Sequence, residues 1–262
     1  MNILIKNTHK CEIFSSVFQY MKLFSENVNI SFSENRLFLQ AMDSSHISII
    51  ELSIPSDWFD TYEHTDNPNV TIGVNTVILF KILSTREKTQ TIQIKYSSDD
   101  SDKMYVDFKS DNKTVFDKHF EVPLMELDTE IMDIPKMEHQ AEFILPSAYF
   151  ASLVSNLKMF GDTLDVECSE EKITLYSHSQ NTGKMSVNIN IDELSSFMID
   201  EGENLKLSFS LNNLYNMAQF HKISNEVEVK LNRDFPMNIT FRLGDENATL
   251  SMYLAPKISE DD

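Results

Sequence analysis

Two hydrophobic patterns alternate along this chain. Apolar residues recur at helical spacing over residues 14–24 and 150–160, which predicts amphipathic helices at 8–25 and 147–160, the second starting at Ser147 after Pro146. Two more helices are predicted at about 75–88 and 210–222. Alternating stretches predict strands at 28–32, 36–42, 47–54, 91–96, 104–109, 114–122, 164–168, 172–177, 184–191, 226–231, 237–243 and 248–254. Helices and antiparallel strands in this mixture predict an α+β fold with the helices on one sheet face.

The second half of the chain repeats the first. Residues 14–40 align with 150–176 without a gap at an offset of 136 positions, so that Phe14 meets Phe150 and Lys22 meets Lys158. Near that offset, 74–83 falls on 211–220 and 91–95 falls on 226–230. We therefore expect a duplicated domain, with the first copy at 1–124, an extended connector at 125–139, the second copy at 140–258 and an acidic tail at 259–262.

Composition narrows the class of protein. The chain of 262 residues carries 41 acidic against 22 basic side chains, a net charge of −19, which argues against a wholly basic binder of nucleic acid or membranes. Its 5 glycines are too scattered to form a phosphate-binding loop. Its 2 cysteines, Cys11 and Cys168, indicate neither a disulfide framework nor a cysteine metal site, and favour a reducing compartment. No apolar run is long enough to span a bilayer, so no membrane association is expected.

The charge is unevenly distributed. The four predicted helices carry a net charge of +5, and the rest of the chain carries −24. If the helices share one surface, that surface attracts phosphate while the remainder repels it. The candidate DNA-facing side chains are Lys10, Lys22, Lys81, Arg86, Lys158 and Lys222. The alternative is that exposed helix positions simply favour lysine.

No catalytic arrangement is recognisable in the sequence. The seven histidines lack metal-ligand spacing, and Cys11 has no basic neighbour to activate it. The acidic run at 99–102 is a candidate magnesium site, but such a run in a turn is usually only solvated. Residues 43–46, Asp-Ser-Ser-His, are adjacent in sequence, whereas a catalytic triad is assembled from separated segments. We expect no enzyme activity, no cofactor and no metal, with a metal-dependent enzyme as a remote alternative.

Several motifs resemble those of the proliferating cell nuclear antigen family of eukaryotic DNA sliding clamps. The segment LQAMDSSHIS at 39–48 and the ending YLAPKI at 253–258 carry most of the resemblance. Shorter motifs occur between them in the order found in clamps, at 59–62, 73–75, 81–83, 134–135, 146–147 and 161–162. The resemblance covers essentially the whole chain and agrees with the duplication, because a clamp subunit consists of two copies of one domain.

The resemblance implies a ring of three identical subunits joined head to tail around duplex DNA. Helices would line the hole, and contact with phosphates would be independent of sequence. Positions that are basic in the family are here Ser152, Ser155, Asn212 and Gln219, so direct contact with DNA is expected to be weak. A clamp-like scaffold that barely touches DNA is the alternative. The family implies the nucleus as the location, or a viral replication compartment if a large DNA virus encodes the chain.

A second implied site is an apolar pocket that receives a short partner peptide bearing an aromatic pair. Such peptides belong to DNA polymerases and other replication proteins, and a clamp loader is also implied. The matching positions are Met42, His46, Ile47, Ile49, Met132, Ile134, Pro135, Pro236, Tyr253, Leu254, Ala255 and Pro256. Without the resemblance, the apolar members of this set would be read as ordinary core residues.

The implied subunit contact pairs strand 114–122 of one subunit with strand 183–191 of the next. The residues expected there are Phe116, Phe120, Val122, Met185, Val187 and Ile189. An ordinary edge within one chain is the alternative. Glu170 stands where many family members carry a lysine that accepts ubiquitin-like modifiers, and Lys172 follows two residues on, so the sequence leaves this modification open.

Overall fold

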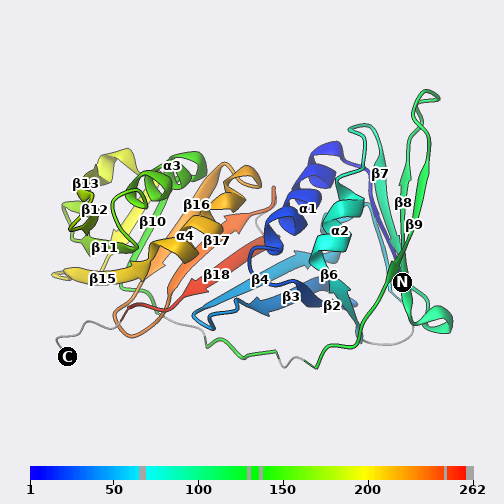
Figure 1. The fold of residues 1–262 in the computed structure, drawn as a ribbon, viewed down its shortest axis with the longest axis horizontal. Coiled ribbons are helices and arrows are strands. Elements are labelled where there is room, and N and C mark those ends of the chain that lie inside the picture. Colours follow the sequence, from blue (N-terminus) through cyan, green and yellow to red (C-terminus); the bar gives the residue numbers. More distant parts are fainter. Residues whose placement is uncertain (65–68, 129–130, 136–137, 245–246, 258–262) are drawn as a thin grey trace. The chain divides into compact units, whose positions relative to one another are not determined.

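A computed structural model describes residues 1–64, 69–128, 131–135, 138–244 and 247–257 of the chain (Figure 1). The expected acidic tail lies outside these residues. Contacts divide the chain into two compact units. The first comprises Met1–Ser44, Ile50–Met132 and Leu243–Leu250, and the second comprises Ser45–Ile49, Asp133–Arg242 and Ser251–Asp262.

The two halves of the chain contain the same elements in the same order. The first half runs β1 (Asn2–Ile5), α1 (Thr8–Met21), β2 (Asn27–Ser33), β3 (Arg36–Met42), β4 (Ser48–Pro55), β5 (Thr61–Glu63), β6 (Asn69–Asn75), α2 (Thr76–Leu83), β7 (Thr91–Lys95), β8 (Lys103–Lys109) and β9 (Lys118–Pro123). The second half runs β10 (Ala141–Pro146), α3 (Ser147–Leu157), β11 (Thr163–Cys168), β12 (Lys172–Ser179), β13 (Gly183–Asn190), β14 (Ser196–Ile199), β15 (Leu205–Ser210), α4 (Leu211–Ala218), β16 (Glu226–Leu231), β17 (Met237–Arg242) and β18 (Thr249–Leu254).

Strand pairing repeats as well. In the first half the strands are ordered β5-β1-β7-β8-β9 and β4-β3-β2-β6, and in the second half β14-β10-β16-β17-β18 and β13-β12-β11-β15. The pairs whose register is known are antiparallel, such as Asn2↔Lys95 in the first half and Ala141↔Leu231 in the second. The predicted duplication and α+β class are therefore confirmed.

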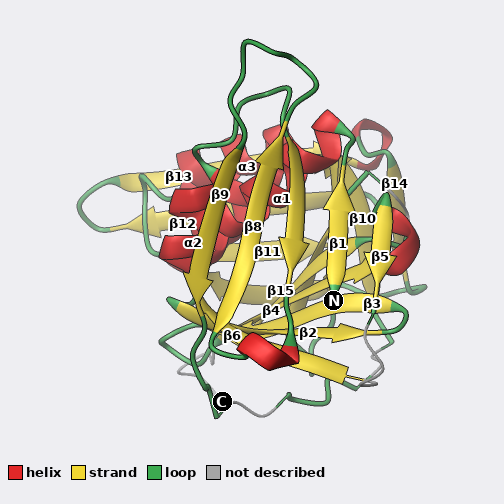
Figure 2. Ribbon diagram, turned by 90° about the vertical axis from the view of Figure 1, so that its right-hand side faces the viewer, coloured by secondary structure: helices red, strands yellow, loops and turns green. Residues whose placement is uncertain are grey.

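Each half carries one pair of adjacent helices, α1 with α2 and α3 with α4. The views in Figures 1 and 2 agree that α1 and α2 cover one face of the sheet formed by β5, β1, β7, β8 and β9. The predicted apolar face of α1 is buried, with Phe14, Val17, Phe18 and Met21 at most 1% exposed. Burial of such side chains is the main force that holds each helix pair on its sheet.

The helices begin where short polar side chains cap them. The side-chain oxygen of Asn7 accepts from the backbone N–H of Lys10, and that of Asn75 accepts from the N–H of Ile78. The predicted start of α3 at Ser147 is correct, but Pro146 occupies the cap position. The Ser147 hydroxyl instead donates to the carbonyl oxygens of His221 and Ser224, which fastens the start of α3 to the turn after α4.

The structure differs from the predicted elements in several places. All four helices end earlier than predicted, because their last turns are short loops or, after α4, the 3₁₀ turn Gln219–Lys222. Strand β9 starts at Lys118, so residues 114–117 are not part of it. The caps Asn75 and Ser210 occupy equivalent places, which shifts the alignment of α2 with α4 by two residues from the predicted one. Six strands were not predicted: β1, β5, β6, β10, β14 and β15.

Candidate functional site

Two lysines lie over aromatic rings at equivalent places in the two helix pairs. Lys22, at the end of α1, has its ammonium nitrogen 4.6 Å from the centroid of the Phe80 ring on α2. Lys158, at the end of α3, lies 4.3 Å from the Tyr215 ring on α4. With the helix caps aligned, Phe80 and Tyr215 are equivalent residues. The duplication has therefore preserved a cation–π contact as well as a fold.

Two other predicted DNA-facing side chains are occupied within the chain. The Lys10 ammonium donates to the carbonyl oxygen of Trp58 at 2.6 Å and lies over its ring. The Arg86 guanidinium donates to the carbonyl oxygens of Glu87, Lys88 and Gln90, at 3.1, 3.2 and 2.8 Å. Lys10 is thus held by a residue 48 positions away and Arg86 by its own loop, so both cations are less available for phosphate than the sequence predicted.

Lys81 on α2 and Lys222 after α4 are exposed, and their ammonium groups have no hydrogen-bond or ion-pair partner among the residues that the structure describes. Apolar side chains stand beside them on the helices. Val77 and Ile78 on α2 are 48% and 40% exposed, and Met159 after α3 is 64% exposed. The helix surface therefore carries few free cations and several exposed apolar side chains.

Part of the predicted peptide pocket is assembled within the second unit. The backbone N–H of Ala255 donates to the carbonyl oxygen of Ile47 at 3.0 Å, which joins the segment after β18 to the segment before β4. The Ile47 side chain is 39% exposed, and Tyr253 and Pro256 are partly exposed. Peptide-docking surfaces typically combine exposed apolar side chains with a well-ordered backbone, as the Ala255–Ile47 hydrogen bond provides here.

His46, next to Ile47, has a positive φ of 59°. This left-handed conformation is uncommon for a residue other than glycine, and it turns the chain sharply into β4. The turn exposes the side chains of His46 and Ile47 while Ser48 is buried. The local backbone thus explains why this short segment reaches the surface.

The predicted connector is anchored by three hydrogen bonds in the first unit, two from the Gln40 side chain and one between backbone groups. Gln40 on β3 binds Met132 in both directions, with its amide donating to the Met132 carbonyl at 2.9 Å and its side-chain oxygen accepting from the Met132 N–H at 2.8 Å. Further back, Met125 donates to the carbonyl oxygen of Gly73 at 3.0 Å. Gln40 lies in the motif at 39–48 that carries the family resemblance, but the sequence reasoning did not identify it as the residue that holds this segment.

The remaining pocket residues vary in exposure. Met42, Met132, Ile49, Ile134 and Pro236 are partly exposed, and Pro135 is exposed. Leu254 is fully buried, so its side chain packs in the core and offers nothing to a peptide. Of Leu254, therefore, only the main chain remains a candidate for contact with a partner peptide.

The two strands predicted to join subunits are each at the end of their sheet order, β9 next to β8 and β13 next to β12. Their side chains alternate: Phe120 packs on Phe108 with ring centroids 5.5 Å apart, and Met185 and Val187 are partly exposed. Val122 and Ile189 are buried within the subunit. Phe116 lies outside β9, in the preceding loop, and is 84% exposed.

The structure gives no support to the alternative chemistries. Within the described ranges, no group of three or more His, Cys, Asp or Glu side chains is placed to hold a metal ion. Burial raises the pKa of the Cys168 thiol to about 11 and is also the main reason that the pKa of Cys11 is raised. Both thiols are therefore poor nucleophiles. No helix in the described part of the chain is both long and apolar enough to cross a membrane.

Comparison with family models covers nearly the whole chain. The model of the proliferating cell nuclear antigen N-terminal domain matches residues 4–131, and that of the C-terminal domain matches residues 133–258. The chain belongs to the proliferating cell nuclear antigen family. The resemblance inferred from the motifs is confirmed, and the fold is that of a sliding clamp. Members of this family are non-enzymatic scaffolds of DNA replication and repair.

Proposed function

We propose that this clamp subunit assembles head to tail with two further copies into a ring that encircles duplex DNA and increases the processivity of a DNA polymerase. The observation that carries the proposal is the match of both family domains to the two structurally equivalent halves of the chain. A clamp acts where DNA is replicated, in the nucleus or in a viral replication compartment. A clamp loader is needed to open the ring.

Strands β9 and β13 support the head-to-tail arrangement. Each ends its sheet, and each carries apolar residues at alternating positions. Two different complementary edges generate a closed ring when the rotation between subunits closes. Antiparallel pairing of β9 with the β13 of a neighbour would satisfy the backbone groups of both edges.

The helix surface supports non-specific contact with DNA. Lys22, Lys81, Lys158 and Lys222 are the basic side chains best placed to meet phosphates, and none of them would read a base. Because Lys10 and Arg86 are engaged within the subunit, electrostatic affinity is low. Retention on DNA then depends on topological enclosure.

Partner proteins dock through the surface around Ile47 and Ala255. An aromatic pair on a short peptide supplies apolar anchors, and the backbone near the Ala255–Ile47 hydrogen bond fixes the direction of the peptide. His46, Tyr253 and Pro256 flank these residues in sequence.

A scaffold that assembles proteins with little direct contact to DNA is the second candidate. It is favoured by the exposed Val77 and Ile78 on α2, since apolar side chains gain nothing from facing phosphates. The two functions share the ring and the docking surface and differ in whether DNA passes through the hole.

Loading onto circular and linear DNA separates the candidates. A ring is expected to have three times the 30.3 kDa subunit mass in native mass spectrometry. Loaded on nicked circular DNA it should stay bound at high salt, and it should slide off after linearisation. A monomer would contradict the ring, and release from closed circles by salt would contradict enclosure. A ring that docks partner peptides but does not load onto circular DNA would restrict the role to scaffolding.

A further inference from the structure

A small cavity lies in the core of the second unit. It is enclosed by α3, by strands β10, β16 and β17 of one sheet and by strands β11 and β12 of the other. The centre of a water-sized sphere can occupy about 20 Å³ of it, which is room for one small molecule. Every lining side chain is at most 6% exposed, so the cavity is buried.

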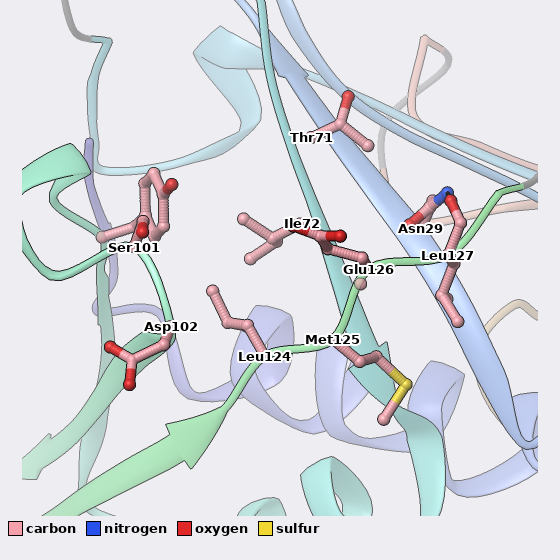
Figure 3. A pocket seen from close by; sticks show the side chains of 11 residues that line it. Asn29, Thr71, Ile72, Ser101, Asp102, Leu124, Met125, Glu126 and Leu127 are labelled. Atoms are coloured by element: carbon pink, nitrogen blue, oxygen red, sulfur yellow. Dashed lines mark hydrogen bonds between the residues drawn. The ribbon is translucent and has the colours of Figure 1, made fainter.

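The chemistry of this cavity differs from that of the groove on the first unit shown in Figure 3. The groove is lined in part by hydroxyl and carboxylate groups, such as those of Thr71 and Asp102. All side chains that line the cavity are apolar, and no polar atom faces it. A buried water needs roughly two to four hydrogen-bond partners, and apolar cavities stay dry. The cavity is therefore closed to water by its chemistry.

The duplication explains why the second unit has this space. Phe18 on α1 is fully buried in the first unit, and its ring packs edge-on against Phe14 with the centroids 5.1 Å apart. At the offset of 136 positions, Phe14 is matched by the identical Phe150. Phe18, however, is matched by Val154, which lines the cavity. The second core therefore lacks one aromatic ring beneath its helix.

Other matched positions around the cavity add to this loss of volume. Three of them are smaller in the second unit than in the first, and one is larger by a single methylene. The smaller ones are Val154 for Phe18, Val166 for Ile30 and Val229 for Ile94, and the larger one is Leu164 for Val28. Because a close-packed core relaxes only partially around missing atoms, such losses leave a void.

The void favours an apolar occupant. Wall atoms that face empty space lack the dispersion contacts that they would make with a neighbour, and an apolar atom of matching size restores them. A polar or charged molecule would lose its hydration and find no hydrogen-bond partner here. The volume limits the occupant to one atom or molecule not much larger than water.

We propose that this cavity binds a single small apolar atom or molecule, of the size of xenon or methane, against Val154 and Leu157 of α3. All of the lining residues belong to the second unit, so the site depends neither on ring formation nor on contact with DNA.

Methyl NMR of the full chain under xenon pressure tests this site, with helium at the same pressure as the control. Xenon should shift the methyl resonances around the cavity in a saturable manner, and helium should not. Methyl groups in the core of the first unit, such as those of Val17 and Ile94, should respond to neither gas. The reporters at the cavity are Val154, Leu157, Val166, Leu175, Val229 and Leu231.

Two variants fill the cavity from different walls. Val154→Ile adds a methylene on α3, and Val166→Ile adds one on β11 and restores the residue of the first unit. Each should weaken xenon binding at least threefold. Val17→Ile adds the same group to the core of the first unit and should leave xenon binding unaltered.

Four results would overturn the proposal. Shifts no larger with xenon than with helium would mean that the cavity takes no ligand. Equal shifts in the first unit would mean that xenon dissolves in any apolar core. Unchanged binding in both filling variants would place xenon elsewhere. Cross-relaxation from water to the cavity methyl groups would show a hydrated site and exclude an apolar ligand.

Discussion

The ammonium group of Lys22 lies over the Phe80 ring, with 4.6 Å between the nitrogen and the ring centroid. Lys158 repeats this relationship with Tyr215 in the second half of the chain. A cation–π contact at an exposed site is worth roughly 0.5 to 1 kcal/mol, enough to restrict the lysine to a few rotamers. The position of each charge on the helix surface is therefore set by its aromatic partner.

Replacing both lysines is expected to weaken DNA binding without affecting the ring. For Lys22→Gln/Lys158→Gln, the slope of log affinity against log salt should become shallower by about 1 for each phosphate that is no longer neutralised. Fluorescence anisotropy of short duplex DNA at several salt concentrations measures this slope. Phe80→Leu keeps the charge of Lys22 but removes its cation–π contact, and should change the salt dependence of DNA affinity less. An equal effect from Lys109→Gln, a change at an exposed position on β8, would show that only net charge matters.

Adding a charge at Ile47 is expected to abolish peptide docking. In Ile47→Asp the backbone hydrogen bond from Ala255 can persist, but the exposed apolar side chain is replaced by a carboxylate that an aromatic anchor cannot desolvate. Affinity for a peptide with an aromatic pair should fall at least tenfold in a calorimetric titration. Met198→Asp places the same charge on β14 at a side chain that is 55% exposed. Unchanged affinity in Ile47→Asp, or equal loss in Met198→Asp, would remove Ile47 from the docking surface.

Gly73→Ala is expected to displace the segment after β9. The added methyl group would lie 2.2 Å from the Met125 carbonyl oxygen and 3.0 Å from a Leu127 side-chain carbon. Because the nearest atom is backbone, relief requires a main-chain shift, and such overpacking costs about 1 to 3 kcal/mol. Urea unfolding should show this loss, whereas Thr71→Ser on the same strand should unfold almost as the unaltered chain does. Equal stability of the alanine variant would mean that segment 124–127 adapts freely.

The sequence predicted the repeated helices because their buried residues, such as Phe14 and Phe150, lie at regular spacing. It placed the start of β9 too early, since residues 114–117 have strand-like composition and only the register with β8 limits pairing to Lys118 onward. It also counted Lys10 as free for DNA. The carbonyl that captures Lys10 belongs to Trp58, 48 positions away, and tertiary contacts of this kind leave no local pattern.

The ion pairs around Glu228 are expected to make stability depend on pH. Burial alone would raise the pKa of Glu228, but hydrogen bonds and charge from Lys230 and Arg242 outweigh burial, so the pKa is lowered. A carboxyl whose pKa is lowered by folding stabilises the fold above its ordinary pKa of about 4.3, and this contribution disappears as pH falls through the folded value.

Glu228→Gln should therefore lower the free energy of unfolding by about 2 kcal/mol at pH 7, because Lys230 and Arg242 lose a buried carboxylate, although Lys230 keeps Glu142 at 3.2 Å. The difference from the unaltered chain should shrink as the pH falls below about 4. Urea unfolding across this range measures both values. Glu121→Gln, at an exposed pair with Lys103, should cost less than about 1 kcal/mol. If the difference in unfolding free energy stays constant with pH, the contribution of Glu228 to stability comes from packing and not from its charge.

The alternation of β13 gives the sharpest test of the subunit contact. Val187 is partly exposed on the face that also carries the buried Ile189, whereas the neighbouring Ser186 is exposed on the opposite face. If β13 pairs with β9 of the next subunit, Val187 adjoins the apolar face that includes Phe120, and Val187→Glu should yield monomers in sedimentation analysis. Ser186→Glu adds the same charge to the same strand and should still form the ring. Monomers from both variants would mean that charge at this edge, and not the apolar face, controls assembly. An intact ring in Val187→Glu would mean that the subunits join through another edge.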